Sequence, residues 1–188
     1  MITNAKFKYA LKDMMNEMPL EDINVTALCA KCGCHRQTFY YHYQDIYDLI
    51  AAILLTEDLG KFETAKTIRE ALRAFVLYAR DNFVFLRQTY GSAAKDLVEE
   101  FMFGKFNVKI FNLIQADPEY AGLKLESKRN LARRLANYIS SEIGYYFKSQ
   151  SYTSEKFYKK MCRIIDSALT LLLPSLVEMN KKEEGKQV

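Results

Sequence analysis

Apolar side chains recur at three- and four-residue steps along almost the whole of this chain. Near its beginning the series is Phe7, Ala10, Leu11, Met14, Met15 and Met18. This spacing places side chains on one face of an α-helix. Only 7 Gly and 3 Pro occur in 188 residues, so the turn residues of a strand-rich fold are scarce. The sequence therefore predicts an all-α fold with short connections.

The same periodicity gives about nine helices. We expect them over residues 3–18, 25–31, 35–41, 46–59, 66–80, 82–90, 93–115, 127–149 and 154–178. Pro19 ends the first helix, and Asn24 is a good N-cap for the second. Gly33 follows the second helix where a left-handed turn residue would lie. Two short helices joined by such a turn are typical of a helix-turn-helix, whose second helix enters a DNA groove.

The two short helices can cross closely because small residues lie between them, and Phe39 and Tyr43 would form the core beneath. That leaves a donor-rich and aromatic set on the outer side of residues 35–42. Arg and Gln side chains can bind base edges through two hydrogen bonds, while Tyr, Thr and His suit phosphate oxygens. The outer set consists of His35, Arg36, Gln37, Thr38, Tyr40, Tyr41 and His42.

The run Gly33-x5-Phe39-Tyr40-x-His42-Tyr43, followed by Asp45-x3-Leu49, resembles the recognition helix and fourth helix of the TetR family. The resemblance implies a three-helix DNA-binding domain over residues 1–45. It also implies a helical effector-binding and dimerisation domain over residues 46–188. It adds Thr26 to the candidate DNA-binding residues, and it implies that Tyr40 contacts a phosphate.

Two features of the N-terminal segment depart from a strong DNA-binding pattern. Residues 1–56 hold 5 Lys and Arg against 6 Asp and Glu, although the whole chain carries a net charge of +4. Ile46 stands where the family usually has Lys or Arg at the start of the fourth helix. Lys6, Lys8 and Lys12 on the first helix could compensate, or they could form an ordinary solvated face.

A cysteine cluster lies in the same segment, with Cys29, Cys32 and Cys34 followed by His35. Zinc needs four ligands that converge tetrahedrally, and in a helix-turn-helix these side chains would diverge. Free cysteine also packs as a small hydrophobic residue, so packing is the favoured interpretation. A redox role stays open, and we expect no metal and no cofactor.

The second half of the chain is rich in aromatic residues, which can line a ligand cavity. Candidate pocket residues are Tyr78, Phe85, Tyr90, Phe101 and Tyr138. The last two helices carry apolar stripes wider than one neighbour can cover, so we expect a homodimer through an intersubunit four-helix bundle. Candidate interface residues are Leu135, Tyr138, Ile139, Tyr146, Ile165, Leu169 and Leu172.

These patterns predict a dimeric transcription regulator that binds a double-stranded DNA operator under the control of an unknown effector. Residues 135–161 also resemble TetR-like activators of dihydroxyacetone kinase operons, which implies that the effector could be a protein instead of a small molecule. The alternative is a protein-interaction module with this fold and weak DNA affinity. A Gly-rich phosphate loop and a His-Glu-x-x-His pattern are both missing, so we do not expect an enzyme. Without a long apolar run or a signal peptide, we expect no membrane contact and a cytoplasmic location.

Overall fold

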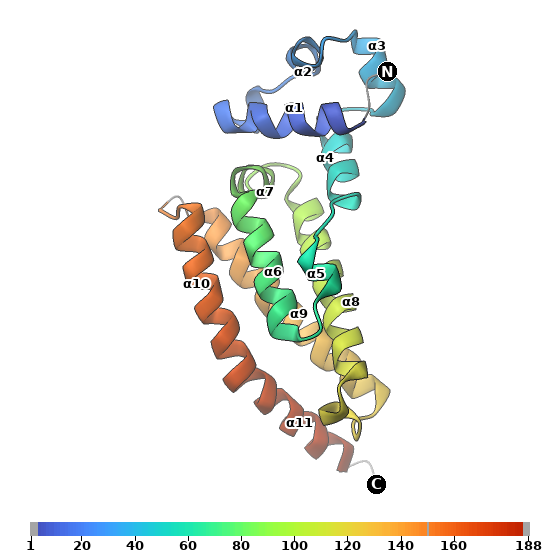
Figure 1. Cartoon of the computed structure of the whole chain (residues 1–188), viewed down its shortest axis with the longest axis vertical. Helices are drawn as coiled ribbons and strands as arrows, with labels where there is room; N and C mark the ends of the chain where they lie inside the picture. The colour runs from blue at the N-terminus through green and yellow to red at the C-terminus, as the bar shows by residue number, and fades with distance from the viewer. Residues whose placement is uncertain (1–3, 150, 186–188) are drawn as a thin grey trace. The chain divides into compact units, whose positions relative to one another are not determined.

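The structure, a computed structural model, describes residues 4–149 and 151–185. Every regular element in these two ranges is helical, and no strand occurs among the residues described. The all-α prediction is confirmed. Contacts between Cα atoms divide the chain into two compact units (Figure 1), one of Met1–Asp58 with Asn82–Phe101 and one of Leu59–Asp81 with Met102–Val188.

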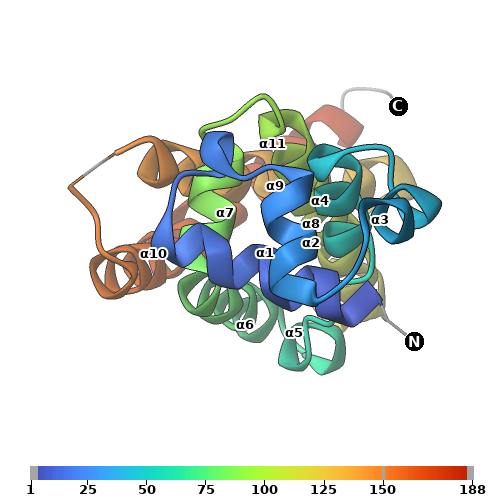
Figure 2. The same ribbon diagram turned by 90° about the horizontal axis from the view of Figure 1, so that it is seen from above.

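The first unit contains the expected helix-turn-helix and one helix from later in the sequence. Its elements are α1 (Asn4–Glu17), η1 (Leu20–Asp22), α2 (Val25–Cys32), α3 (Arg36–His42), α4 (Ile46–Leu55) and α7 (Phe83–Tyr90). Helix α8 (Lys95–Ala116) begins in this unit and continues into the second. Figure 2 looks down onto α2 and α3.

Helix α7 is tied to the end of α1 by one glutamine. The Gln88 side-chain amide donates to the Met15 carbonyl oxygen at 2.7 Å, and its Oε1 accepts from the Leu20 amide nitrogen at 2.7 Å. These bonds satisfy backbone groups that a helix end would otherwise leave unpaired. Gln88 therefore pairs with backbone groups at the end of α1 and the start of η1, about seventy residues earlier in the sequence.

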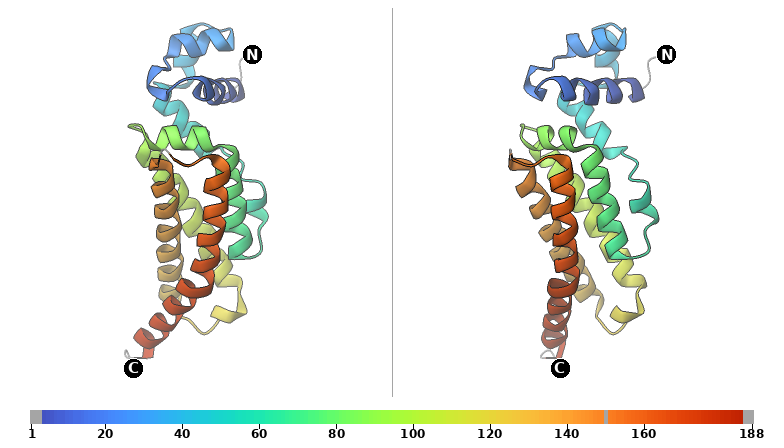
Figure 3. Two further views of the ribbon diagram at one scale, coloured as in Figure 1. Left: turned by 90° about the vertical axis from the view of Figure 1, so that its left-hand side faces the viewer. Right: turned by 60° about the vertical axis from the view of Figure 1, so that its left-hand side comes forward.

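The second unit is a bundle of longer helices. Its other elements are α5 (Lys61–Thr64), α6 (Ile68–Asp81), η2 (Pro118–Tyr120), α9 (Leu125–Lys148), α10 (Ser154–Ser167), η3 (Ala168–Leu172) and α11 (Leu173–Gly185). Phe62, Phe75 and Phe106 form an aromatic centre in its core, with the last two ring centroids 4.5 Å apart. The two helices α9 and α10 run alongside each other (Figure 3).

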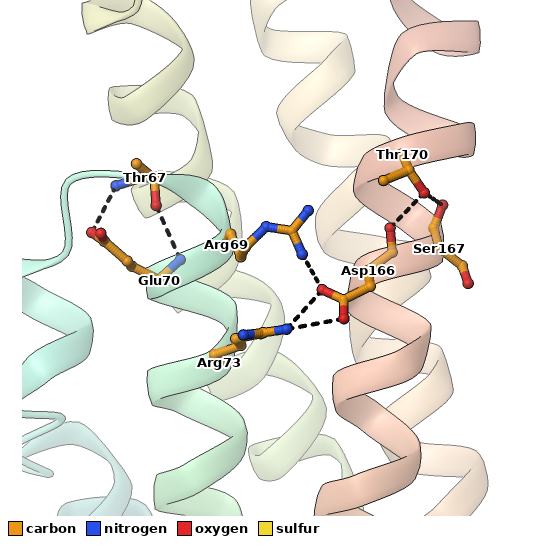
Figure 4. A network of polar contacts seen from close by, with 7 residues as sticks. All are labelled: Thr67, Arg69, Glu70, Arg73, Asp166, Ser167 and Thr170. Carbon is orange, nitrogen blue, oxygen red and sulfur yellow. Dashed lines mark hydrogen bonds and ion pairs between the residues drawn. The ribbon is translucent and has the colours of Figure 1, made fainter.

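An ion-pair network links α6 to α10 on the surface of the second unit (Figure 4). Asp166 of α10 binds Arg69 and also Arg73, whose Nη2 lies 2.9 Å from Oδ2 of the carboxylate. The first turn of α6 is held by a reciprocal pair, because the Glu70 carboxylate accepts from the Thr67 amide and the Thr67 hydroxyl accepts from the Glu70 amide.

Two features of the second unit differ from the sequence prediction. The four-residue helix α5 was not expected. The final helix was expected to be uniform over residues 154–178, but a π-helical segment separates α10 from α11. Pro174 follows this segment; it lacks an amide donor and its ring collides with the carbonyl four residues earlier, which explains the local widening. Among the described residues, no helix has the length and apolarity to cross a membrane.

Candidate nucleic-acid interface

The turn between α2 and α3 has the geometry that a helix-turn-helix requires. The Asn24 side chain caps α2 by accepting from the Ala27 amide at 3.0 Å. At the other end Gly33 adopts φ 64° and ψ 41°, a left-handed conformation that glycine takes without steric cost. The Cys34 and Gly33 amides donate back to the carbonyls of Cys29 and Ala30, at 3.0 and 3.1 Å. This pattern ends α2 sharply and sets the direction in which α3 begins.

The inner side of α3 is anchored by aromatic packing. Phe39 has no exposed surface, and its ring meets that of Phe7 on α1 edge to face at 5.4 Å between centroids. Tyr43, which is also buried, lies 5.5 Å from Phe39 and 6.0 Å from Phe7. The predicted orientation of α3, with Phe39 inside, is confirmed.

The polar residues of α3 lie on its outer side. Tyr41 is 85% exposed and Tyr40 is 50% exposed. The Arg36 Nη2 donates to the Tyr40 hydroxyl at 3.4 Å, and its guanidinium carbon lies 5.8 Å from the centre of that ring. Thr38 is half-buried, and the remaining predicted residues are exposed, namely Thr26, His35, Gln37 and His42. All eight side chains are therefore at least partly accessible, and their contact with DNA stays a prediction.

A shallow hollow of about 460 Å³ lies beside Arg36 and Tyr40, where the starts of α2 and α4 meet α3. Thr26 from α2 and Tyr47 from α4 also line it. Sequence reasoning missed Tyr47, which is 39% exposed and could place a hydroxyl on a phosphate. The sequence pattern drew attention to Ile46, which stands where the family usually has Lys or Arg, but that side chain is only 9% exposed. Residue 46 therefore contributes to the core, and the adjacent residue supplies the polar group at the start of α4.

The lysines of α1 are engaged within the first unit. The Glu57 carboxylate, which is 7% exposed, binds the ammonium groups of Lys8 at 2.9 Å and Lys12 at 3.1 Å. Lys12 also donates to the Asn82 side-chain oxygen at 2.7 Å. Burial lowers the pKa of Lys12, although the carboxylate of Glu57 acts in the opposite direction. Lys6 donates to the Cys32 carbonyl oxygen at 3.4 Å. These contacts give the three lysines structural partners instead of the free surface role considered from the sequence.

Two of the three cysteines are packed inside the first unit, as expected from the sequence, and the third is less buried than expected. Cys29 and Cys32 are buried, and Cys34 is half-buried. In the part of the chain that is described, no group of three or more His, Cys, Asp or Glu side chains is arranged to hold a metal ion.

The five candidate pocket residues are distributed over both units. Phe85, Tyr90 and Phe101 belong to the first and Tyr78 and Tyr138 to the second. Phe85 and Tyr90 are buried in their own unit, where the Tyr90 hydroxyl donates to Glu99 at 2.8 Å. A separate hollow of about 410 Å³ in the second unit is lined by residues of α5, α6 and α10, none of them from this set. The effector pocket stays a prediction.

The candidate interface residues fall into two groups by exposure. Four are buried within the single chain, namely Leu135, Ile139, Tyr146 and Ile165. These four can shape a dimer surface but contribute little area to it in this conformation. The other three are half-buried, namely Tyr138, Leu169 and Leu172. Nearby helices also expose apolar side chains that the sequence reasoning did not name, with Leu171 at 70% and Tyr145 at 66%.

The helix-turn-helix and the helical bundle together define a TetR-like fold, as comparison with solved structures shows. The structure of the dihydroxyacetone kinase operon activator DhaS matches with a TM-score of 0.67. The match covers 88% of this chain and 95% of that chain at 19% sequence identity. No protein-family model and no curated protein sequence matches the chain. The fold is thus one that a transcription regulator uses.

Proposed function

We propose that this protein is a dimeric DNA-binding transcription regulator whose operator affinity is controlled by an effector bound to its C-terminal helical domain. The proposal rests mainly on one observation, that α3 has a buried side and an accessible side. Phe39 is fully buried, whereas Arg36, Tyr40 and Tyr41 stand on the accessible side of the same helix. A rigid helix with an outward row of donors is what major-groove recognition requires.

Residues four apart lie on the same side of α3, and we assign different DNA contacts to two such pairs. Arg36 and Tyr40 line the hollow with Thr26 and Tyr47, beside the acidic residues Glu21 and Asp45. We assign phosphate contacts to the hydroxyl groups there. Gln37 and Tyr41 lie on the adjacent strip of the helix and are candidates for base edges. This assignment is part of the proposal.

The test is a selection of duplexes from a randomised pool, followed by fluorescence anisotropy on the selected sequence. Arg36→Ala should weaken binding about fivefold or more, because a charged contact is worth about 1–3 kcal/mol. Arg129→Ala is the matched control, since Arg129 is an exposed arginine of α9 in the second unit. Equal affinity of both variants, or no enrichment of any duplex at low salt, would contradict the proposal.

The proposed dimer rests on the exposed apolar residues of the C-terminal helices, which include Leu171 and Tyr145. Light scattering should give the mass of two chains at micromolar concentration. Leu171→Glu should produce monomers, whereas Val108→Glu, which changes a similarly exposed apolar residue of α8, should leave the mass unchanged. A monomeric mass for the wild type, or a dimeric mass for Leu171→Glu, would contradict the proposal that this surface forms the dimer.

One observation favours a second candidate, a protein-interaction module with the same fold. Three lysines near the helix-turn-helix are engaged inside their own unit, because Lys8 and Lys12 share the Glu57 carboxylate and Lys31 binds Asp13. DhaS is named as an operon activator. That name does not distinguish a small-molecule effector from a protein effector. The affinity of Arg36→Ala, measured separately for DNA and for a captured protein partner, distinguishes the two candidates. A loss of partner binding alone would favour the interaction module.

A further inference from the structure

The turn of the helix-turn-helix places two cysteines next to each other. When a helix ends on a left-handed residue with these two backward hydrogen bonds, side chains just before and just after the turn meet. In this chain the two meeting positions are Cys29 and Cys34, joined by the 3.0 Å bond from the Cys34 amide to the Cys29 carbonyl. Cys32 is directed elsewhere, since its Sγ lies 3.8 Å from the Lys6 carbonyl oxygen.

The two sulfurs differ in access. Cys29 is buried, while Cys34 is half-buried and is therefore the one that a small oxidant reaches first. Burial raises the pKa of Cys29 to about 11, with the neighbouring Cys34 as the next cause. Cys29 therefore keeps its proton at neutral pH. Because the thiolate is the reactive form, Cys29 is not the sulfur that reacts with the oxidant first.

We propose that Cys29 and Cys34 form a reversible disulfide on exposure to hydrogen peroxide, and that this bond switches off DNA binding. The second part rests on the proposed function. The Cys34 sulfur, as thiolate, attacks one peroxide oxygen, the O–O bond breaks, and the leaving hydroxide takes a proton to become water. The Cys29 sulfur then attacks the Cys34 sulfenic acid. The S–S bond forms, the S–O bond breaks, and the hydroxide leaves as water with the Cys29 proton.

The expected effect on DNA binding follows from the geometry of the turn. An S–S bond of about 2.05 Å is much shorter than any contact between two unlinked sulfur atoms, so closing it draws Cys29 and Cys34 together. We expect the backbone on both sides of Gly33 to move with them. Because α3 begins at Arg36, two residues after Cys34, this movement displaces the residues proposed to face the groove.

Tryptic peptides can identify the bond. Trypsin cuts after Lys12, Lys31 and Arg36, so Cys29 lies in peptide 13–31 while Cys32 and Cys34 share peptide 32–36. After peroxide treatment, mass spectrometry should show these two peptides linked, and dithiothreitol should release them. The link should persist in Cys32→Ala and disappear in Cys34→Ala. A link that survives Cys34→Ala, or thiols that stay unoxidised in the folded wild type, would overturn the proposal.

The functional part is measured on the same samples by anisotropy with the selected duplex. Oxidised wild type should lose at least tenfold in affinity and regain it with dithiothreitol, while Cys34→Ala should be unaffected by peroxide. A linked protein that binds DNA as tightly as the reduced form would refute the switch. If the reduced protein binds no duplex at all, the proposed function fails, and the peptide map still decides whether the disulfide exists.

Discussion

Phe39 and Tyr41 are two residues apart in α3, and the helix turns them to opposite sides. Phe39 has no exposed surface, whereas Tyr41 is 85% exposed. Phe39→Ala should lower the free energy of unfolding by about 3–5 kcal/mol, because it removes a buried ring between Phe7 and Tyr43. Tyr41→Ala should change it by less than about 0.5 kcal/mol. Urea denaturation followed by circular dichroism measures both, and similar losses for the two variants would contradict the proposed orientation.

Tyr90 gives the first unit a pH dependence. Burial and the hydrogen bond to Glu99 raise the pKa of Tyr90 to about 12, from an ordinary value of 10.0. Between these values the unfolded chain loses the phenol proton and the folded chain retains it. Stability is therefore fully present below pH 10 and falls as the pH rises towards 12.

Tyr90→Phe removes this titration. Denaturation at pH 9 and pH 11.5 should show the wild type losing more stability than the variant, by an amount on the order of 2 kcal/mol. The other tyrosines titrate equally in both proteins, so the difference isolates residue 90. Equal losses in the two proteins would show that Tyr90 ionises normally.

Single residues were predictable where local spacing decides their environment. Phe39 and Tyr41 could be placed because a helix fixes which side each occupies. Lys8 and Lys12 could not be placed, because their partner Glu57 lies more than forty residues away and only tertiary packing joins them. The accessibility of Tyr47 was not expected, since at a helix start a one-residue shift of the buried face decides whether residue 46 or residue 47 is accessible.

At the scale of elements, α7 completes the end of α1 through Gln88. Gln88→Leu keeps the approximate size but leaves the Met15 carbonyl and the Leu20 amide without their partner. We expect a loss of about 1–3 kcal/mol in the free energy of unfolding and faster amide exchange at Leu20. Gln115→Leu, at an exposed position of α8, is the control. Unchanged exchange at Leu20 would show that α7 is dispensable for the helix end.

Long amphipathic helices were predictable, and their irregularities were not. The stripe from Phe157 to Ile165 indicated α10 correctly. The π-helical segment before Pro174 was missed because proline at that position can be accommodated by a kink, a break or a widened turn. Helix α5 has only four residues, too few to show a periodicity of 3.6.

For the whole molecule, sequence order indicated a division at residue 45, which is a functional prediction and is still open. The two compact units follow spatial proximity instead, since Asn82–Phe101 joins the helix-turn-helix. The sequence pattern does not show that residues 82–101 belong to the first unit, because their association depends on long-range contacts such as those of Gln88 and Asn82. The fold class needed only periodicity and was therefore accessible from the sequence.

The charge distribution predicts a weak salt dependence of DNA binding. With Lys8, Lys12 and Lys31 bound to carboxylates, few cations besides Arg36 are available for phosphates. A plot of log affinity against log salt should have a slope of roughly −2 to −4 for a dimer. Lys8→Ala should leave this slope unchanged, whereas Arg36→Ala should reduce it. A slope steeper than about −6 would mean that the lysine pairs open on DNA.

The most direct test of the account is a tyrosine-modification footprint of the unmodified protein. Tyr40 and Tyr41 are exposed on α3, and Tyr158 is half-buried on α10 in the second unit, outside the proposed dimer surface. The selected duplex should protect Tyr40 and Tyr41 from iodination, read by mass spectrometry, and leave Tyr158 as reactive as before. If Tyr41 stays fully reactive in the presence of saturating duplex, the outer side of α3 is not the DNA-binding surface.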